Sequence, residues 1–513
     1  MRRLVAAALV AALVSGCGST VQVTGTATGA SPGDGLSAPV PGSTTAGSAD
    51  GSTGSGGTTG TSAGSLGAGS TGSRTTGGAS VPGGTSGGPV GTGSTGTSAV
   101  GPLSGRGFTK TTISLGVATA NDYNAFAGSL GINGVGYQGD PRVWMQAAAD
   151  EINKHGGLLG RKVVLVAHDF SSAQELSDTA AADQTACTDW TQDHQVYAVL
   201  FAGFIVEDTL LNCLAKADTP LIYPGAGLDT PLHYSGTYRK YPLFFNLAQM
   251  LGDTWDRLVI DRLVARDFFT PWDTRNGRPG TAGANPVKIG IIATDDPDGQ
   301  VQLASVEKQL SRHGLKPTTV VECPRSLQEK VSCDQSAVLK FASSGVSHVF
   351  GGGVDFMKTA KSQGYRPRYF INSEATNYAA NEDASQLNGS MSEGYDPFID
   401  VDPSAYPGDP TPATTKCKKL MKAAGQAATD PTTLYLQMSV CDEFFFVEAA
   451  VARAGRLGSG ALRAGLEALG GSVPSAVTWT TFLGPNDHAS ARALRDIDYR
   501  NGKYVYVSTK NYS

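Results

Sequence analysis

Short apolar strands alternate with helix-like segments in two successive series, and this alternation limits the possible folds more than any other feature of the chain. The first series begins with the β-branched run at 112–117, and the second begins with a similar run at 287–292. Helices that alternate with short apolar strands are typical of parallel sheets wound by right-handed crossovers. The sequence therefore predicts an α/β protein with two doubly wound lobes.

The elements of each series follow from apolar spacing and from Gly and Pro boundaries. Pro141 starts a helix with apolar residues at Val143, Ala147 and Ile152, and the pair Gly156-Gly157 ends it. In the first series we further expect strands at 162–167, 197–201 and 220–223, and helices at 171–188 and 206–216. In the second series we expect strands at 317–322, 347–350 and 368–372, and helices at 299–313 and 334–343.

The N-terminus has the pattern of a secretory signal. Met-Arg-Arg precedes an apolar run of about eleven residues, and a membrane-spanning helix would need about 20. The sequence Val14-Ser15-Gly16-Cys17 is similar to a bacterial lipobox, in which small residues admit a peptidase and the thiol receives the lipid. We therefore predict a lipoprotein signal peptide over 1–17 and a lipid-anchored extracytoplasmic protein, at the outer face of the cytoplasmic membrane or in the periplasm. An ordinary signal peptide that happens to end near a cysteine is the alternative.

Residues 18–106 consist mainly of Gly, Ser and Thr. A segment with almost no aromatic residues and no apolar period cannot bury a core, so we predict a disordered tether. A random coil of about 90 residues has a root-mean-square reach of roughly 50 Å. The same composition also suits an O-glycosylated spacer.

Charge and cysteine content narrow the possible partners and the compartment. The formal net charge is −5 and no long basic run occurs, so nucleic acid is not an expected partner. Besides Cys17 there are six cysteines, without zinc-type spacing. In an exported protein, disulfides between chain neighbours are the simplest interpretation, although six cysteines allow 15 pairings and buried thiols remain the alternative for a cytosolic chain. The six residues are Cys187, Cys213, Cys323, Cys333, Cys417 and Cys441.

A longer motif follows the first helix. The stretch EINKHGGLLGRKVVLV at 151–166, followed by Asp169, closely resembles the family of leucine/isoleucine/valine-binding proteins. Pro224-Gly225-Ala226, the run 289–292 followed by Asp298-Gly299, and Gly484-Pro485 followed by Asp487 agree with that family in the same order. The resemblance covers about 108–513, which is the whole predicted folded body.

This resemblance implies a type I periplasmic-binding-protein fold with two lobes joined by three crossing segments. The first lobe would take about 108–243 and 396–475, and the second about 244–395 and 476–513. A small organic solute would be held between the lobes, at the C-terminal ends of the strands, and delivered to an ABC permease in the membrane.

The residues just after the strand ends are the candidate solute contacts. The resemblance places Glu374 where amino-acid binders carry the carboxylate that holds the ligand's ammonium group, whereas a solvated surface glutamate is the alternative. Phe204 and the region of Gly227 fall where the family uses Ser and Thr hydroxyl groups and backbone amides to hold the ligand carboxylate, and Gly203 follows the same strand end as Phe204. Asp298 falls where the family has a tyrosine. The full candidate set is Glu374, Ser373, Phe204, Gly203, Gly227, Asp298 and Asp355.

These departures change the expected ligand. A pocket with Phe204 in place of a hydroxyl group makes fewer hydrogen bonds to a free carboxylate. We therefore expect an amino-acid-like or amide-like solute other than plain leucine, isoleucine or valine. Phe204 would instead be a core residue under the alternative interpretation. The lost hydroxyls also leave a second function open, in which the same fold serves as a sensor or protein-interaction module without transport.

An enzyme is not expected. The folded body contains no nucleophile elbow, no HExxH motif and no phosphate loop after a strand. Asp295, Asp296 and Asp298 are close in sequence, but the glutamate that ends an EF-hand loop is missing. We therefore predict neither a cofactor nor a metal site.

Overall fold

A computed structural model describes residues 104–513 apart from 121, 123, 126–136, 202–205, 226–233, 325–326, 373–374, 376–378, 380–381, 383 and 403–407. The predicted signal peptide, Cys17 and nearly all of the predicted tether lie outside the described residues. Arg106, the last residue of the predicted tether, belongs to the folded body. Its guanidinium donates to Thr219 Oγ1 at 2.9 Å and to the carbonyl of Thr191 at 2.8 Å. Two distant segments therefore hold this side chain.

The first sheet has six strands in the order β13-β5-β4-β3-β1-β2. All of its pairings are parallel. The strands are β1 (Thr112–Thr119), β2 (Lys162–Asp169), β3 (Ala198–Phe201), β4 (Leu221–Tyr223), β5 (Phe244–Met250) and β13 (Ala489–Ala491).

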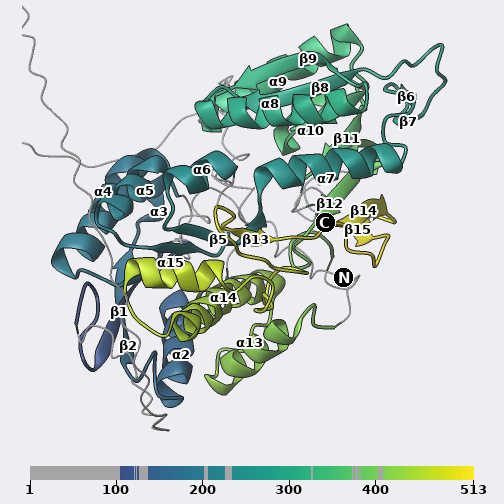
Figure 1. The fold of residues 1–513 in the computed structure, drawn as a ribbon. Helices are drawn as coiled ribbons and strands as arrows, with labels where there is room; N and C mark the ends of the chain where they lie inside the picture. Colours follow the sequence, from purple (N-terminus) through teal and green to yellow (C-terminus); the bar gives the residue numbers. More distant parts are fainter. Residues whose placement is uncertain are drawn as a thin grey trace, which may run out of the picture. The chain divides into compact units, whose positions relative to one another are not determined.

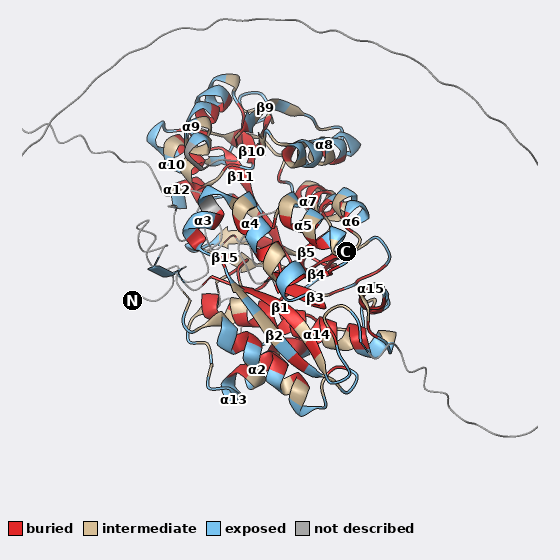
Figure 2. Ribbon diagram, turned by 90° about the vertical axis from the view of Figure 1, so that its left-hand side faces the viewer, coloured by how far each residue is buried: buried red, intermediate tan, exposed pale blue. Residues whose placement is uncertain are grey.

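Helices cover both faces of this sheet (Figure 1). One face packs against α2 (Pro141–Lys154), α13 (Pro412–Ala423), α14 (Pro431–Ala454) and α15 (Ser459–Glu467). The other face packs against α4 (Thr179–Thr188), the π-helical turn η2 (Asp189–Asp193), α5 (Asp208–Lys216) and α6 (Ser235–Lys240). Buried residues are concentrated in the strands and on the inner sides of α2 and α14 (Figure 2).

The second sheet has seven strands in the order β15-β14-β12-β11-β10-β8-β9. The strands are β8 (Ile289–Thr294), β9 (Pro317–Cys323), β10 (His348–Phe350), β11 (Arg368–Ile371), β12 (Met391–Gly394), β14 (Arg495–Arg500) and β15 (Lys503–Tyr506). One face packs against α7 (Gly252–Ala265) and α8 (Pro297–Arg312). The other packs against α9 (Leu327–Ser344), α10 (Val354–Ser362) and α12 (Ala384–Leu387). A short hairpin, β6 (Trp272–Asp273) and β7 (Arg278–Pro279), precedes β8.

Each sheet repeats the same winding, so the predicted fold of two doubly wound lobes is confirmed. The order β2-β1-β3-β4-β5 in the first sheet corresponds to β9-β8-β10-β11-β12 in the second. This is the doubly wound order of flavodoxin-like sheets. The antiparallel strands β14 and β15 extend only the second sheet.

The sheets assign two stretches differently from the predicted lobe boundaries. β5 pairs with β4, and β13 pairs with β5, so residues 244–250 and 489–491 lie in the first sheet rather than the second lobe. The amide of Asn246 donates to the carbonyl of His488 at 2.8 Å, and His488 Nδ1 lies 3.0 Å from the carbonyl of Phe244. Residues more than 200 positions apart in the sequence pair with each other here, and this pairing places both stretches in the first sheet.

The predicted helix at 171–188 is divided in two. α3 (Ser172–Ser177) ends at Asp178, which has φ −154° and accepts a hydrogen bond from the amide of Ala181 through its side chain. Through this side-chain hydrogen bond, Asp178 caps the next helix, α4. The prediction missed the break because Asp178 is followed by a good helix-forming run.

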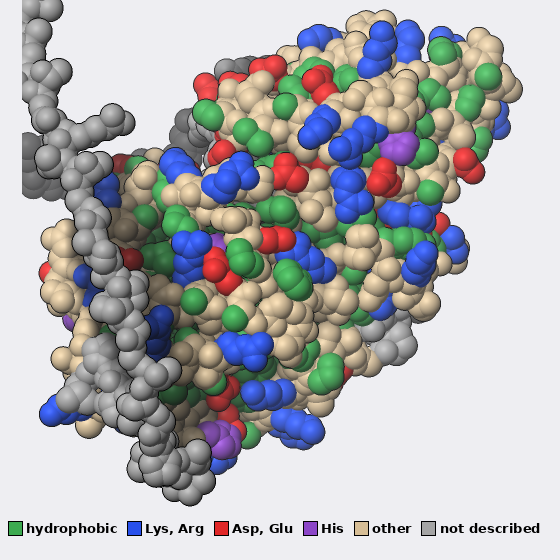
Figure 3. All heavy atoms as spheres, in the orientation of Figure 1, with side chains coloured by type: hydrophobic (Ala, Val, Ile, Leu, Met, Phe, Trp, Pro, Cys, Tyr) green, Lys and Arg blue, Asp and Glu red, His purple; other side chains and the backbone are tan. Residues whose placement is uncertain are grey.

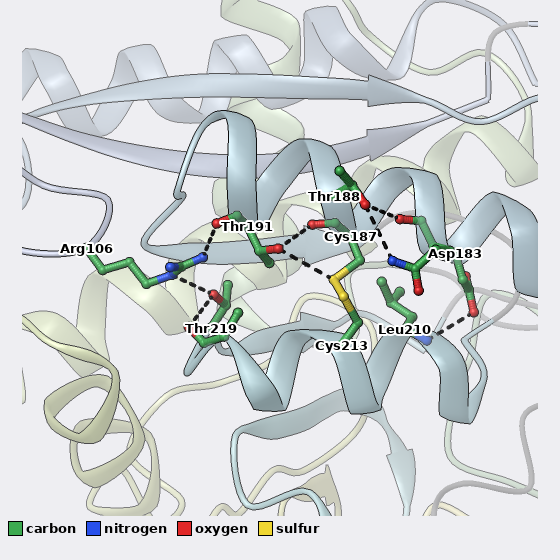
Figure 4. Close-up of a disulfide and its surroundings, with 10 residues drawn as sticks. Arg106, Asp183, Cys187, Thr188, Thr191, Leu210, Cys213 and Thr219 are labelled. Atoms are coloured by element: carbon green, nitrogen blue, oxygen red, sulfur yellow. Dashed lines mark hydrogen bonds between the residues drawn. A yellow bond between two sulfur atoms is a disulfide. The ribbon is translucent and has the colours of Figure 1, made fainter.

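Three disulfides join chain neighbours: Cys187–Cys213, Cys323–Cys333 and Cys417–Cys441. The first connects α4 to α5, and its surroundings include the Arg106 contacts and a hydrogen bond from the amide of Leu210 to Asp183 (Figure 4). The third connects α13 to α14, and both of its cysteines are fully buried.

Removal of the Cys417–Cys441 disulfide should destabilise the protein. The bond closes a loop with a sequence separation of 24, for which loop-closure entropy predicts about 3–4 kcal/mol. We expect the Cys417→Ala/Cys441→Ala protein to unfold several degrees lower in a calorimetric scan. The Cys323→Ala/Cys333→Ala protein, with a separation of 10, should lose slightly less. Equal melting temperatures for the wild type and both variants would contradict this account.

Candidate functional site

Each of the two described sheets has a topological switch point, where the connections of two neighbouring strands lead in opposite directions along the sheet. In the first sheet it lies between β1 and β3, and in the second between β8 and β10. Ligands of doubly wound sheets bind in the crevice outside the carboxyl ends of strands at such points. The two switch points are therefore the candidate binding edges of the protein.

The second-lobe edge carries two of the predicted residues. Asp298 lies in the first turn of α8, directly after β8, and Asp355 lies in the first turn of α10, directly after β10. Because β8 and β10 are adjacent and parallel, the structure brings both aspartates to the same edge of the sheet. Lys358 Nζ lies 3.9 Å from Asp355 Oδ1.

Further charged groups lie beside the β10–α10 connection. Lys330 Nζ donates to Asp334 Oδ2 at 2.9 Å, and both atoms are close to the position that a side chain on Gly353 would take. Burial raises the pKa of the Asp334 carboxyl, and the nearby Lys330 opposes that rise. This edge of the second lobe therefore carries both acidic and basic side chains, which pair with one another.

The first-lobe edge is organised by Asp122, which the sequence reasoning did not select. Its carboxylate accepts hydrogen bonds from the amide of Ser172 at 3.0 Å and from Ser172 Oγ at 2.7 Å, and Ser171 Oγ lies at 3.2 Å. Tyr137 donates its hydroxyl to the carbonyl of Ala120, just after β1, at 2.9 Å. These contacts fix the segment after β1 to the segment after β2.

Five of the predicted contact residues lie outside the described residues. They are Gly203, Phe204, Gly227, Ser373 and Glu374. Their positions in the sequence are nevertheless bounded by described strand ends, because β3 ends at Phe201, β4 at Tyr223 and β11 at Ile371. Their roles stay predictions.

Three crossing segments connect the two sheets. The first leads from β5 into α7, the second from β12 to α13, and the third from β13 to β14. On the second-lobe side, Arg266 donates to Glu393 of β12 and Asp498 of β14, and Arg262 donates to Asp496 through two bonds of 2.9 Å. These arginines connect the C-terminal end of α7 to β12 and β14, the strands that adjoin the second and third crossings.

On the first-lobe side, Asp442 of α14 holds the segment that leads from α15 to β13, ahead of the third crossing. Its buried carboxylate accepts hydrogen bonds from the amide of Ala476 at 2.6 Å and from Ser475 Oγ. Thr411, at the end of the second crossing, donates to the carbonyl of Ser475. Burial raises the pKa of Asp442 to about 7. Sequence reasoning missed this residue because an aspartate within a long helix usually indicates a solvent-facing position.

A shallow depression of about 510 Å³ lies on the first lobe, beside α4 and η2. Its polar lining includes a hydrogen bond of 2.9 Å between His168 Nδ1 and Asp189 Oδ2. The lining residues are His168, Gln184, Thr185, Thr188, Asp189 and Asp193. None of them belongs to the predicted set.

In the part of the chain that the structure describes, no group of three or more His, Cys, Asp or Glu is placed to hold a metal ion. None of the helices in the same part is long and apolar enough to cross a bilayer. On the face shown in Figure 3, Lys and Arg side chains are interspersed with Asp and Glu.

Comparison with known proteins defines the class. A sequence model of the periplasmic binding protein family matches residues 135–496. The chain therefore belongs to the periplasmic binding protein family, as the motif at 151–166 predicted. This is a family of binding proteins rather than enzymes. A comparison with curated proteins finds no match.

Solved structures show the same fold at low sequence identity. A substrate-binding protein of an ABC transporter from Desulfitobacterium hafniense, in complex with leucine, is 16% identical with a TM-score of 0.51, over 77% of this chain and 99% of that one. A fatty acid ABC transporter substrate-binding protein from Thermomonospora curvata is 15% identical, with a TM-score of 0.50, over 80% and 94%. A branched-chain amino acid ABC transporter protein from Thermus thermophilus with bound valine is 14% identical, with a TM-score of 0.51, over 79% and 96%.

Proposed function

We propose that this protein is an extracytoplasmic solute-binding lipoprotein that captures a small organic solute between its lobes and delivers it to an ABC permease. The observation that carries the proposal is the pair of equivalent switch points, one in each sheet, on lobes joined by three crossing segments. Ligand-driven closure of two lobes needs binding contacts that only the closed form offers. Cys17 would anchor the protein to the membrane through its lipid.

The proposed solute class rests on the residues that the sequence predicts as solute contacts. Glu374, which follows β11 in the sequence, would receive an ammonium or amide group, and Ser373 would add a hydroxyl. Phe204, Gly203 and Gly227 would offer apolar surface and backbone groups instead of hydroxyls. This combination suits an amino-acid-like or amide-like solute with a larger apolar part than leucine, isoleucine or valine. The Thermomonospora curvata relative, named for fatty acids, supports the view that this fold accepts extended apolar ligands.

A thermal-shift screen of the full-length protein tests this function. The panel contains amino acids, amides, short peptides, aromatic acids and medium-chain fatty acids. Free ligand at about 100 times Kd should add roughly 2.7 kcal/mol of stability, which corresponds to a shift of about 5–10 °C at 2–4 °C per kcal/mol. We expect one amine- or amide-bearing class to give such a shift.

Glu374→Gln should then weaken binding of that class by roughly 10- to 100-fold, since a hydrogen bond to a charged group contributes about 1.5–3 kcal/mol. Glu151→Gln is the matched control, because Glu151 is a partly exposed acid on α2 with an ion pair to Lys154, and it should bind as the wild type does. A screen without any shift would contradict solute capture and favour a sensor or protein-interaction module with the same fold.

A further inference from the structure

Two side chains link the second crossing segment to the end of a strand in the other sheet. Tyr395, the first residue after β12, donates its hydroxyl to Gln249 Oε1 near the end of β5. The Gln249 amide nitrogen in turn donates to the carbonyl of Gly225 at 3.3 Å. Gly225 lies just after β4. The three residues form a continuous hydrogen-bonded chain from the second lobe to the first.

Tyr395 is fixed on the second-lobe side of this chain. Its ring is 7% exposed and belongs to the core formed by α7, α8 and the second sheet. The ring of Trp255 from α7 packs edge-on against it, with ring centroids 5.3 Å apart. The next residue, Asp396, donates its amide to Asp400 Oδ2 at 2.7 Å. The hydroxyl group of Tyr395 therefore moves with the second lobe.

Gly225 is fixed on the first-lobe side. Its φ of +78° is in the left-handed region, and a Cβ atom there would lie 2.9 Å from Ala248 Cβ and 3.0 Å from Asn246 Oδ1. Only glycine fits this close approach without strain. Asn246 Oδ1 also accepts the amide of Gln249 at 3.1 Å, so the backbone that carries the Gln249 side chain is held in place.

We propose that Gln249 is a positioning residue that couples movement of the second crossing segment to the backbone at the C-terminal end of β4. Its amide group is the connecting element, because it accepts from one lobe and donates to the other. Rotation of the second lobe would displace the Tyr395 hydroxyl and release or tighten the contact with Gly225. The inference deepens the proposed function, since this strand end borders the predicted first-lobe contact Gly227.

Amide hydrogen exchange of the full-length protein, measured by mass spectrometry without any added solute, tests the coupling. Tyr395→Phe keeps the ring and removes only the hydroxyl. We expect it to raise exchange about 3- to 10-fold in peptides that cover 219–225 and 244–251, as well as in those near 395. A net hydrogen bond of about 1 kcal/mol corresponds to roughly a fivefold change in local opening. Gln249→Ala should raise exchange in the same peptides at least as much.

Tyr365→Phe is the matched control. The Tyr365 hydroxyl donates to the carbonyl of Val346 at 2.8 Å, within the second lobe, so exchange should change only near 346–350. Wild-type exchange at 219–225 in Tyr395→Phe would overturn the proposal, and so would an equal rise there in Tyr365→Phe. Because no solute is present, this result is independent of the thermal-shift screen, and either claim can fail alone.

Discussion

Arg266→Ala should destabilise the protein by about 3–5 kcal/mol, the usual loss when one partner of a buried ion pair is removed. Arg266 caps the C-terminal end of α7 and is mostly buried, and its partner Glu393 is fully buried. The guanidinium also donates to the carbonyls of Ser392 and Ile497, both at 3.0 Å. The variant leaves these carbonyls and the Glu393 carboxyl group without this donor, whereas Asp498 keeps its pair with Arg500. Urea unfolding at pH 7 measures the loss.

The pKa values of Glu393 and Asp496 depend on the neighbouring arginines. Burial raises the pKa of Glu393, and the charge of Arg266 opposes that rise. Burial alone would raise the pKa of Asp496 as well, but hydrogen bonds from Arg262 and Glu393 lower it below its ordinary value. Glu393→Gln should therefore restore part of the stability that Arg266→Ala removes.

Arg500→Ala is the control for charge loss alone. Arg500 also pairs with Asp498, at 2.7 Å, but its side chain is 58% exposed, and exposed pairs contribute about 0–1 kcal/mol. We expect a loss within that range. Equal losses in Arg266→Ala and Arg500→Ala would show that the buried cluster does not hold the crossing segments.

The second large effect is a loss of stability as the pH rises, caused by Asp442. Its ordinary carboxyl pKa near 4 is raised by burial to about 7 in the folded protein. Between these values the folded state binds more protons than the unfolded state, so stability falls as the pH increases. The contribution is present below about pH 4 and is lost by about pH 7. Its size is on the order of 4 kcal/mol at 1.36 kcal/mol per pH unit.

Asp442→Asn should remove this part of the pH dependence. An asparagine can still accept the amide of Ala476 and can donate to Ser475 Oγ. Urea unfolding at pH 5 and pH 8 should therefore give a smaller difference for the variant than for the wild type. Burial also raises the pKa of Asp183 to about 7, so some dependence should remain. Asp150→Asn, on the exposed side of α2, should behave as the wild type, and an unchanged slope in Asp442→Asn would contradict the assignment.

Local sequence patterns predicted most of the strands and helices of both lobes. Each of them, such as the run at 112–117 or the helix after Pro141, is decided by neighbouring residues. The sheet to which a strand belongs, in contrast, is decided by its pairing with residues far away in the sequence. β5 and β13 are recognisable as strands only through their pairing, in which Asn246 meets His488 across more than 200 residues. The lobe boundaries at 243 and 475 were therefore misplaced.

In the candidate site too, local sequence predicted some residues, whereas those that depend on distant partners were missed. The resemblance at 151–166 and the strand ends predicted Asp298 and Asp355, and the structure places both at one switch point. Asp122, Gln249, Tyr395 and Asp442 were missed because their roles depend on partners from other segments. Gln249 and Tyr395, for example, are 146 residues apart. No spacing rule within the sequence connects such pairs.

The most direct test of solute capture is a crystal structure of the protein with the solute that gives the largest thermal shift. We predict that the solute contacts the segments after β3 and β4 of the first sheet and those after β8, β10 and β11 of the second, with its amine or amide near Glu374. A solute bound instead in the depression beside His168 and Asp189, or touching only one sheet, would contradict the account.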